Sequence, residues 1–261
     1  MDLIVIGAGV AGSVLTSMAR LQGLETLLID ADPQQAGSRW ALAALRKSWD
    51  AATQEALDWY SLNGGLSNPD TLVTDYMGRK KLQRDWYFVD PRDVLTKPDV
   101  EAWVTSVARG VAFTDGGRYE ARRVVVAHND GDTVESWGCT AYSADATVLE
   151  AEARHHWLRP FHGITVVRST DGLVRLGSSV APSRAAAEAR TRRMVQEATE
   201  LGLVSTGTWT YGAGRRYGRS SPESYGGVSY LGGSARLGFT LAPARARAFL
   251  HDIGVAAKIE R

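Results

Sequence analysis

Cysteine is almost absent from this sequence: Cys139 is the single cysteine among 261 residues. One cysteine excludes a disulfide framework and a cluster of cysteine metal ligands, and it favours a reducing compartment. Long apolar runs are also lacking. No stretch reaches the length that crosses a membrane, and the short apolar run at the N-terminus fits a first strand better than a signal peptide. We therefore expect a cytoplasmic protein with no membrane partner and no bound metal.

An excess of either charge is missing as well, because 30 Lys and Arg stand against 29 Asp and Glu. The distribution is nevertheless uneven. Between Arg175 and Arg219 eight arginines accompany three glutamates, a surplus of five positive charges that leaves the rest of the chain near −4. A solvated helix with an arginine-rich loop is the simpler explanation of this segment, the basic block, and a surface for an anionic partner is the alternative.

The first 32 residues carry the pattern of a nucleotide-binding βαβ unit. Leu3 to Ile6 is an apolar run typical of a buried parallel strand, and Gly7, Gly9 and Gly12 follow at G-x-G-x-x-G spacing. The first glycine permits a sharp turn, the second lets the backbone approach a pyrophosphate, and the third lets the next helix pack closely on the strand. That helix, expected over Ala11 to Leu21, directs its N–H groups and positive dipole end toward the phosphates.

An acidic residue after the second predicted strand narrows the choice of nucleotide. The strand covers Glu25 to Ile29, and Asp30 follows it directly. A carboxylate at this position accepts hydrogen bonds from both ribose hydroxyls, and it disfavours the 2′-phosphate of NADP. Strand, glycines, helix, strand and acid occur in the right order, so a merely structural glycine turn is the weaker explanation.

The remaining sequence predicts further helices and strands. Helices are expected after Ser38 as N-cap, and over Thr53 to Tyr60, Pro98 to Val107, Ser183 to Leu201 and Leu241 to Ile253. Strands are expected at Leu72 to Tyr76, at Lys81 to Val89, in hairpins that turn at Asp115-Gly116 and Asp171-Gly172, and at 227–233. Glycine-rich turns thus precede helices at both ends of the chain, which suggests one extended ligand held at both its ends.

Four further segments match motifs of a known family. YFVDPRDVL is similar to a V-D-P that precedes a helix, ARRVVVAHN to a V-V-x-A-x-G strand, and TVVRSTDGLVRLGSS to a D-G-x-V-x-x-G hairpin. The most specific is GGSARLGFTLAPARARAFL, which is close to a G-H-G-x-x-G-x-T-L-A-P ending. In this order, and together with the N-terminal motif, the segments resemble the flavin oxidoreductases of the D-amino-acid oxidase and glycine oxidase family.

The resemblance implies an α/β fold with FAD as cofactor. A Rossmann-like FAD-binding domain would comprise residues 1–62, 97–131 and 226–261, with a reduced, β-rich substrate region, 63–96 and 132–225, intimately inserted into it. In the family the C-terminal turn and helix lie beneath the pyrimidine end of the flavin. The helix dipole favours the negative charge that collects there on reduction.

The residues that the resemblance implies at the cofactor form three groups, at the diphosphate, near the ribose and phosphates, and along the isoalloxazine. They are Gly7, Ala8, Gly9, Val10, Ala11 and Gly12; Asp30, Ala31, Ser38 and Arg39, with Val111 and Ala127; and Gly233, Ser234, Ala235, Arg236, Leu237, Gly238, Phe239 and Thr240.

The substrate carboxylate is bound in the family by an arginine of a G-x-R segment. GRRYGRSSP resembles that segment, which implies Arg216 for this role, with Arg215 and Arg219 as substitutes. Arginine suits the role because its planar guanidinium binds a carboxylate at two points. Tyr230 on the following strand is implied as a lining residue, so the predicted catalytic residues are Arg216 and Tyr230. His155, His156 and Cys139 are interpreted as packing or surface residues, because a neutral amine gives hydride to flavin N5 without a strong base.

The chain departs from the family pattern where the substrate would bind. It is markedly shorter than typical members, Ser234-Ala235 replaces the usual His-Gly, and His128-Asn129 occupies the place of a glycine-bearing turn. A trimmed substrate region leaves the flavin face more open, which suits an amino group carried on something bulky. The family includes the oxidase domain of a tRNA-modifying enzyme, and the basic block fits such a target.

We therefore predict an oxidase of a glycine-like carbon–nitrogen bond that passes electrons to O2 and produces H2O2. The substrate is a small amine or amino acid, either free or attached to DNA or RNA. A flavin-binding protein without turnover is a third alternative. The identity of the amine, the electron acceptor and the oligomeric state stay open at this level.

Overall fold

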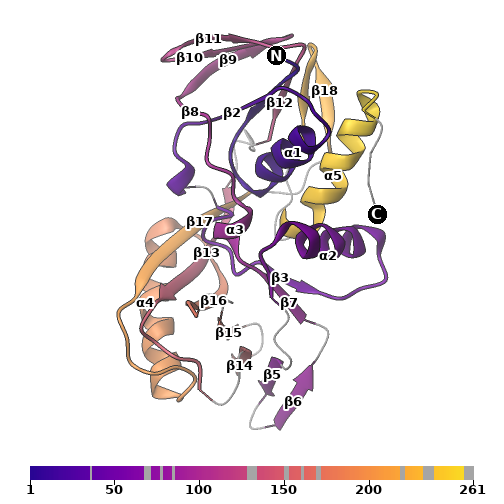
Figure 1. Cartoon of the computed structure of the whole chain (residues 1–261). Helices are drawn as coiled ribbons and strands as arrows, with labels where there is room; N and C mark the ends of the chain where they lie inside the picture. The colour runs from indigo at the N-terminus through magenta and orange to yellow at the C-terminus, as the bar shows by residue number, and fades with distance from the viewer. Residues whose placement is uncertain are drawn as a thin grey trace.

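The computed structural model describes residues 1–35, 37–67, 72–76, 79–83, 86–127, 134–149, 153–159, 162–168, 172–217, 221–231 and 238–255. Two sheets dominate it, each with its own helices (Figure 1). The first contains the N-terminal strand and the second lies below it in the view of Figure 1.

The first sheet has the strand order β18-β19-β12-β1-β2-β8. Its strands are β1 (Leu3–Ile6), β2 (Thr26–Asp30), β8 (Val100–Glu101), β12 (Arg123–Val126), β18 (Glu223–Tyr225) and β19 (Val228–Tyr230). All neighbouring pairs are parallel except β18 with β19. A parallel sheet of this kind, with the first strand in its middle, is the predicted nucleotide-binding architecture.

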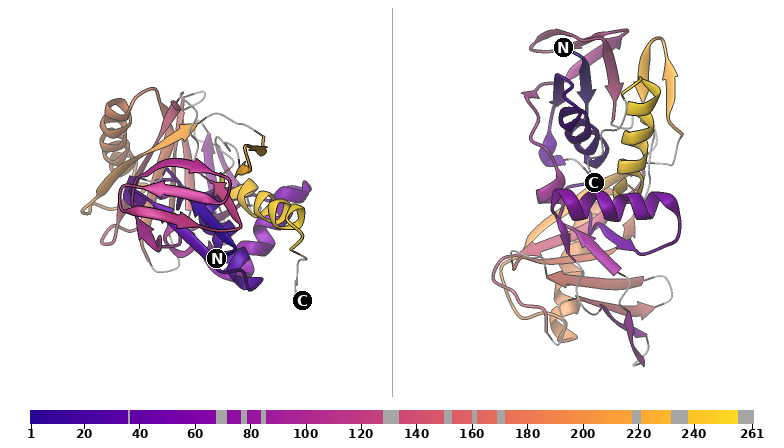
Figure 2. Two further views of the ribbon diagram at one scale, coloured as in Figure 1. Left: turned by 90° about the horizontal axis from the view of Figure 1, so that it is seen from above. Right: turned by 45° about the vertical axis from the view of Figure 1, so that its right-hand side comes forward.

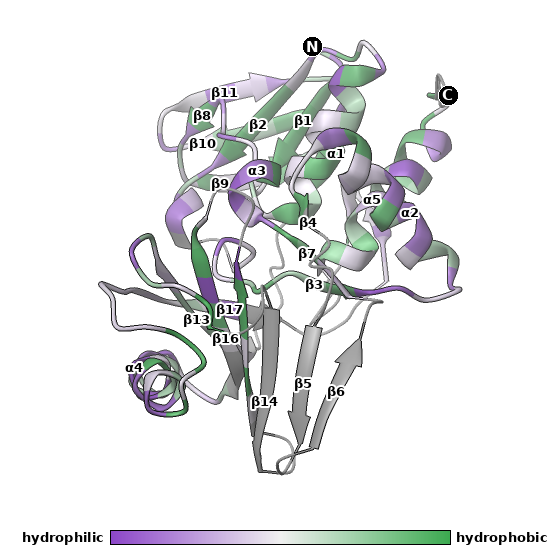
Figure 3. Ribbon diagram, turned by 60° about the horizontal axis from the view of Figure 1, so that its bottom comes forward, coloured by the Kyte–Doolittle hydropathy of each residue, from purple (hydrophilic) through white to green (hydrophobic). Residues whose placement is uncertain are grey.

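Both faces of the first sheet are covered. Leu3 and Val5 face a core shared with α1 (Val10–Leu21), α2 (Ala51–Asn63) and α5 (Gly238–Asp252). Ile4 and Ile6 alternate to the opposite face, toward a three-stranded sheet of β9 (Val104–Ala108), β10 (Val111–Thr114) and β11 (Gly117–Glu120). Figure 3 shows β1 and β2 as mostly hydrophobic between these two layers. Burial on both faces explains the uninterrupted apolar run at the N-terminus.

The second sheet has the order β17-β13-β16-β15-β14-β5-β6. Its strands are β5 (Leu72–Tyr76), β6 (Arg79–Gln83), β13 (Val134–Ser143), β14 (Ala153–Arg159), β15 (His162–Arg168), β16 (Val174–Ala181) and β17 (Thr210–Tyr217). Helix α4 (Arg184–Glu200) lies along β13, β16 and β17 (Figure 2). Met194, Val195 and Ala198 of α4 pack with Leu176 of β16 in the core beneath that helix.

A small third sheet joins the two larger ones. It consists of β3 (Ala44–Arg46), β7 (Trp86–Val89) and β4 (Leu66–Ser67), and a short helix, α3 (Pro91–Val94), follows β7. Leu45 and Val89 belong to the core of the first sheet, whereas Phe88 packs against Val167 of β15. The third sheet therefore buries its two faces against different halves of the molecule.

Much of the sequence-based assignment is confirmed. The α/β class, the N-terminal βαβ unit, α2 and the hairpin β5–β6 are present, and α4 begins at Ser183, whose Oγ accepts from the Ala186 N–H at 3.2 Å. Helix α5 begins three residues earlier than expected, at Gly238. The expected long strand over Lys81 to Val89 is split into β6 and β7, which belong to different sheets.

Two predicted helices are wrong. Residues 98–107 contain β8, which joins the first sheet, and β9, which does not. Val100, Val104 and Val107 are partly buried against the cluster of Ile4 and Ile6 as strand residues, and Trp103, which the helical pattern counted as core, is 66% exposed. The segment after Ser38 leads into β3. A 3-10 turn (Pro33–Gln35) precedes it. Side chains of the second sheet donate hydrogen bonds to carbonyl groups of this segment that would accept from backbone N–H groups in a helix.

Candidate functional site

The turn between β1 and α1 is built by two glycines. Gly7 has a φ of 103°, a conformation that favours glycine. A Cβ atom on Gly12 would lie 1.9 Å from the Gly7 carbonyl oxygen and 3.2 Å from the Ala127 Cβ. Helix α1 thus approaches its strand at a distance that only glycine permits at position 12.

Gly9, the second glycine of the motif, has more room around it within the described part of the chain. Of the described residues, one would lie near a Cβ atom there: Ser38, whose Oγ would be 3.4 Å away. The N–H of Val10 donates to that Oγ at 3.0 Å, while the N–H groups of Ala11 and Gly12 have no acceptor within the described part of the chain. The start of α1 therefore presents backbone donors and a positive dipole end, which together bind anions.

Asp30 lies across from this turn, at the end of β2. Its Oδ2 accepts from the Ala8 N–H at 2.5 Å and its Oδ1 accepts from the Asp32 N–H at 2.8 Å. Each carboxylate oxygen can accept more than one hydrogen bond. Asp30 therefore braces the glycine turn and still has acceptor capacity for ligand hydroxyls.

The C-terminal helix begins at the same place as the first one. A Cβ atom built on Gly238, the first residue of α5, would lie 3.3 Å from Cγ1 of Val10, the first residue of α1. Two helix N-termini, and hence two positive dipole ends, lie side by side. This pairing fits the prediction that one ligand is held by glycine turns from both ends of the chain.

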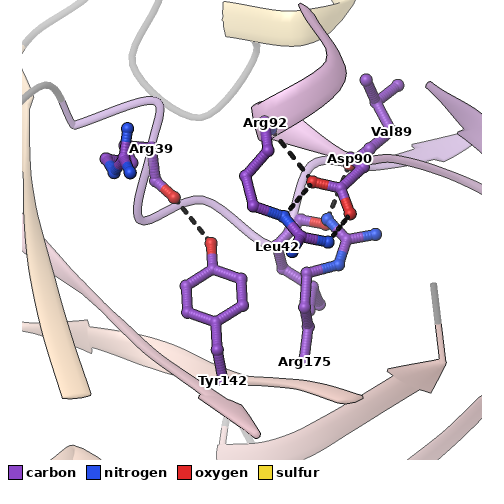
Figure 4. Close-up of polar contacts among 7 residues, drawn as sticks. All are labelled: Arg39, Leu42, Val89, Asp90, Arg92, Tyr142 and Arg175. Atoms are coloured by element: carbon purple, nitrogen blue, oxygen red, sulfur yellow. Dashed lines mark hydrogen bonds and ion pairs between the residues drawn. The ribbon is translucent and has the colours of Figure 1, made fainter. Parts of the chain in front are cut away.

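The segment after Ser38 connects this turn to the second sheet. We call residues 37–42 the junction loop. Side chains of the second sheet donate to three of its carbonyl groups: the Tyr142 hydroxyl to Arg39 O at 2.6 Å, Thr140 Oγ1 to Trp40 O at 2.7 Å, and Arg175 Nη1 to Leu42 O at 3.4 Å. Figure 4 shows Tyr142 and Arg175 reaching the loop from below. Thr140 and Tyr142 lie on β13, and Arg175 lies opposite Tyr142 on β16.

Glycines of β17 let the junction loop lie directly on that strand. A Cβ atom on Gly212 would overlap the Trp40 ring, at 1.8 Å from Cε3, and one on Gly214 would lie 2.6 Å from the Gly37 carbonyl oxygen. Trp40 also contacts Tyr142, with ring centroids 5.7 Å apart. The loop that carries Ser38 is therefore fixed by the second sheet, so the two halves of the molecule shape one site.

A buried charge network lies beneath the loop (Figure 4). Arg175 is fully buried, and its Nη1 donates to the Val89 carbonyl at 2.7 Å. Asp90, which caps α3, accepts from Arg92 Nη2 at 2.6 Å and Nε at 3.0 Å. Burial alone would raise the pKa of Asp90, but the hydrogen bonds from Arg92 and the positive charge of Arg175 lower it. Burial raises the pKa of Tyr142 to about 12, so this phenol keeps its proton.

The basic block is not one surface. Arg175, its first member, is buried, which corrects its inclusion in a binding face. On α4, Arg184 and Arg193 form ion pairs with Glu188 and Glu197 at 2.9 and 2.8 Å. Two further arginines stack on rings: Arg192 on Tyr211 at 4.9 Å and Arg215 on Trp137 at 5.5 Å. Much of the positive charge is thus engaged locally.

The other predicted site residues are spread over several elements. Ala31 directly follows β2, Val111 begins β10, and the Ala127 N–H donates to Ile6 O at 2.8 Å beyond the end of β12. Phe239 and Thr240 lie in the first turn of α5. Residues 233–237 and Arg219 lie outside the described residues.

The two predicted catalytic residues are on different sheets. Tyr230 ends β19 and packs against the cluster that contains Val126 and Val228 of the first sheet. The backbone of Arg216 pairs with Ser136 in the second sheet, and its side chain lies outside the described residues. The same holds for the side chains of His155 and His156, whereas Cys139 is buried, as its interpretation as a packing residue requires.

Sequence reasoning missed the residues that hold the junction loop, namely Thr140, Tyr142 and Arg175. One signal was present. Arg175 interrupts the apolar run LVRLG, and an arginine in a buried strand needs local acceptors. The carbonyl groups that accept here belong to residues far away in the sequence, so their identity could not be inferred.

The fold defined by these elements is that of FAD-binding oxidoreductases. This chain superposes on glycine oxidase from Bacillus cereus with a TM-score of 0.74 and 12% sequence identity, over 98% of this chain and 96% of that one. Iminodiacetate oxidase from Chelativorans sp. matches with a TM-score of 0.66 and 12% identity, covering 99% of this chain and 97% of that one. The glycerol-3-phosphate dehydrogenase from Bacillus halodurans, complexed with FAD, matches 98% of this chain and 65% of that one, with a TM-score of 0.65 and 13% identity.

At the level of sequence, no family model and no curated protein matches the chain. None of the helices in the described ranges combines the length and the apolar character needed to cross a membrane.

Proposed function

We propose that this protein binds FAD at the paired N-termini of α1 and α5. The residues present fit the group. Among the described residues only Ser38 lies near the Gly9 position, the Ala11 and Gly12 N–H groups have no acceptor, and Asp30 retains acceptor capacity for ribose hydroxyls. Gly238, Phe239 and Thr240 would adjoin the flavin, together with residues 233–237. The pairing of two helix N-termini is the observation that carries this proposal, and the FAD-bound neighbour supports it.

The domain division follows from the same proposal. Residues 1–62, 97–131 and 226–261 would form the FAD-binding part, and 63–96 and 132–225 the substrate region. Val111 and Ala127 would lie at the edge of the dinucleotide site, and Arg39 would follow Ser38 along the phosphates. The junction loop then links the cofactor to the substrate side.

The proposed activity is oxidation of a carbon–nitrogen bond in a small amine or amino acid. FAD would supply the acceptor for a hydride from the carbon next to a neutral amine. The iminium ion left behind would release one proton to give the imine, and O2 would take up the two electrons with two protons to give H2O2. The names of the neighbours, an oxidase of glycine and an oxidase of iminodiacetate, support an amine-type substrate.

Substrate binding is assigned to Arg216, which would hold a carboxylate through two hydrogen bonds, with Arg215 or Arg219 as substitutes. Tyr230 would line the approach to the flavin. Tyr142 and Arg175 have an indirect role in this scheme: they hold the junction loop in place and do not contact the substrate.

A second candidate function is oxidation of an amino group attached to DNA or RNA. The exposed Arg192 and Arg193 on α4 favour it, although the ion pair of Arg193 with Glu197 reduces the positive charge available to bind phosphates. Binding of RNA should then weaken steeply with salt, since each neutralised phosphate contributes to the slope of log K against log salt. Charge reversal at Arg190, Arg192 and Arg193 should weaken RNA binding and spare turnover of free glycine.

Anaerobic mixing of the flavin-loaded protein with glycine, sarcosine, iminodiacetate and D-alanine tests the activity. Bleaching of the flavin absorption band by one of them, followed by H2O2 formation when O2 is admitted, is the expected result. Dithionite bleaching with no response to any of these compounds, or to an RNA that carries a glycine unit, would identify a flavin-binding protein without turnover.

A further inference from the structure

Helix α5 has a gap in its hydrogen bonding close to its N-terminus. In an α-helix each carbonyl accepts from the N–H four residues later. The residue four positions after Phe239 is Pro243, which has no N–H, and Pro243 lies inside α5. The first turn of the helix therefore lacks the bond that Phe239 O would otherwise receive, and the proline ring also crowds this carbonyl.

Tyr60 of α2 fills this gap. Its hydroxyl donates to the Phe239 carbonyl at 2.9 Å, across 179 residues of sequence. Figure 1 shows α2 lying across the lower end of α5, where this turn is located, and Figure 2 shows the same arrangement after rotation. A side chain from another helix thus replaces a backbone donor.

The surroundings make this hydrogen bond hard to replace by water. Tyr60 is fully buried, Phe239 is 6% exposed, and their ring centroids lie 6.1 Å apart. Burial also raises the pKa of Tyr60, so its hydroxyl remains a donor over the whole working range of pH. A buried carbonyl without a hydrogen-bond partner costs free energy, so this bond stabilises the packing of the first turn of α5 against α2.

The position of that turn links Tyr60 to the proposed cofactor. Gly238 lies next to Val10 at the start of α1, since a Cβ built on it would be 3.3 Å from Val10 Cγ1, so the turn held by Tyr60 lies beside the proposed phosphate-binding end of the first helix. We propose that Tyr60 is a positioning residue for the flavin, an inference that rests on the proposed FAD site. Its hydroxyl replaces the hydrogen bond missing at Pro243 and so fixes the N-terminal turn of α5. The positive end of this helix would stabilise the reduced flavin.

Tyr60→Phe and Pro243→Ala, alone and combined, test this inference. Tyr60→Phe removes only the hydroxyl, whereas Pro243→Ala supplies the backbone N–H that Phe239 O lacks. For each variant we would measure the dissociation constant of FAD by titrating the apoprotein, the ratio of reduced to oxidised flavin in equilibrium with a reference dye, and the melting temperature.

Tyr60→Phe should weaken FAD binding about fivefold, the change expected for one hydrogen bond. It should also lower the reduced-to-oxidised ratio about two- to fivefold, the range of a helix-dipole effect. With Pro243→Ala present, the same substitution should change both quantities much less. If Tyr60→Phe alone does not fold, the comparison of Pro243→Ala with the double variant still measures how much the loss of the hydroxyl matters once residue 243 has an N–H.

A lower melting temperature with an unchanged FAD affinity and an unchanged redox ratio would show that Tyr60 only packs the core. An equally large effect of Tyr60→Phe with and without Pro243 would also overturn the inference. These results are distinct from failure of the proposed function, in which the unmodified protein would bind no FAD at all.

Discussion

Val10 and Gly238 lie next to each other, although they begin two helices more than two hundred residues apart in sequence: a Cβ built on Gly238 would be 3.3 Å from Val10 Cγ1. The contact brings the N-terminal and C-terminal glycine-rich turns to one place. An extended anionic ligand placed there would meet two positive helix ends, an arrangement beyond what a single βαβ unit provides.

Substitution of two glycines in one motif should separate folding from ligand binding. Gly12→Ala places a Cβ 1.9 Å from the Gly7 carbonyl oxygen, and should lower the free energy of unfolding by about 3 kcal/mol through overpacking. Among the described residues the new Cβ of Gly9→Ala meets Ser38 Oγ alone, at 3.4 Å, so this variant should fold normally and bind FAD more weakly. Thermal unfolding and FAD titration of both variants check this. Equal loss of stability in both would show that Gly9 serves the fold alone.

The N-terminal βαβ unit was predictable because its determinants are local. The alternation of Leu3 and Val5 with Ile4 and Ile6 requires only a strand buried on both faces, and Gly7 and Gly12 act on their own turn. The predicted helix at 98–107 failed because Val100, Val104 and Val107 satisfy a helical period by coincidence. Their burial against the first sheet as strands is a tertiary effect that overrides the local pattern.

The candidate site was predictable only in part for the same reason. Asp30 and the glycines are recognised by spacing, whereas the junction loop depends on Thr140, Tyr142 and Arg175, about a hundred residues or more away. Tyr60 could not be found either. The position of Pro243 within a predicted helix indicates that one backbone hydrogen bond is missing. Which side chain supplies the donor instead depends on the packing of α2 on α5.

Asp30→Asn should weaken FAD binding about ten- to a hundredfold, because hydrogen bonds to a charged group contribute more than those to a neutral one. The amide keeps the shape of the side chain but only one oxygen acceptor, so it can keep one of the two hydrogen bonds that the Ala8 and Asp32 N–H groups donate to Asp30. Asp32→Asn, two residues on, is the matched control and should bind FAD like the unmodified protein. An unchanged affinity in Asp30→Asn would place the ribose elsewhere.

Asp90 should make the stability of the protein sensitive to acid. Its pKa in the folded state lies below the ordinary value of 3.8, so its contribution is present above that pH and is lost as the pH falls through the folded value. Asp90→Asn should lower the free energy of unfolding by about 2–3 kcal/mol at pH 7, because buried positive charge loses its partner. Denaturant titrations at pH 7 and below pH 4 should show this difference shrinking with acidification. A difference that is constant with pH would contradict the assignment.

Arg216→Ala should lower kcat/KM for a carboxylate-bearing amine by hundreds-fold or more, equivalent to about 3–5 kcal/mol for a buried ion pair with substrate. The flavin content should not change, because the residue lies in the second sheet. Arg215→Ala is measured beside it, because Arg215 is a substitute for this role; since Arg215 is exposed and stacks on Trp137, we expect the smaller loss there. If Arg219→Ala produces the loss and Arg216→Ala does not, the carboxylate is bound by the later arginine.

The central claim, that the two helix N-termini hold FAD, is tested most directly by titrating the purified protein separately with FAD and with NAD and following flavin fluorescence and absorption. We predict saturable binding of one FAD per chain, weakened in Gly9→Val because a side chain then stands where the pyrophosphate passes. Binding of NAD without any binding of FAD, or FAD binding that Gly9→Val leaves unchanged, would contradict the account.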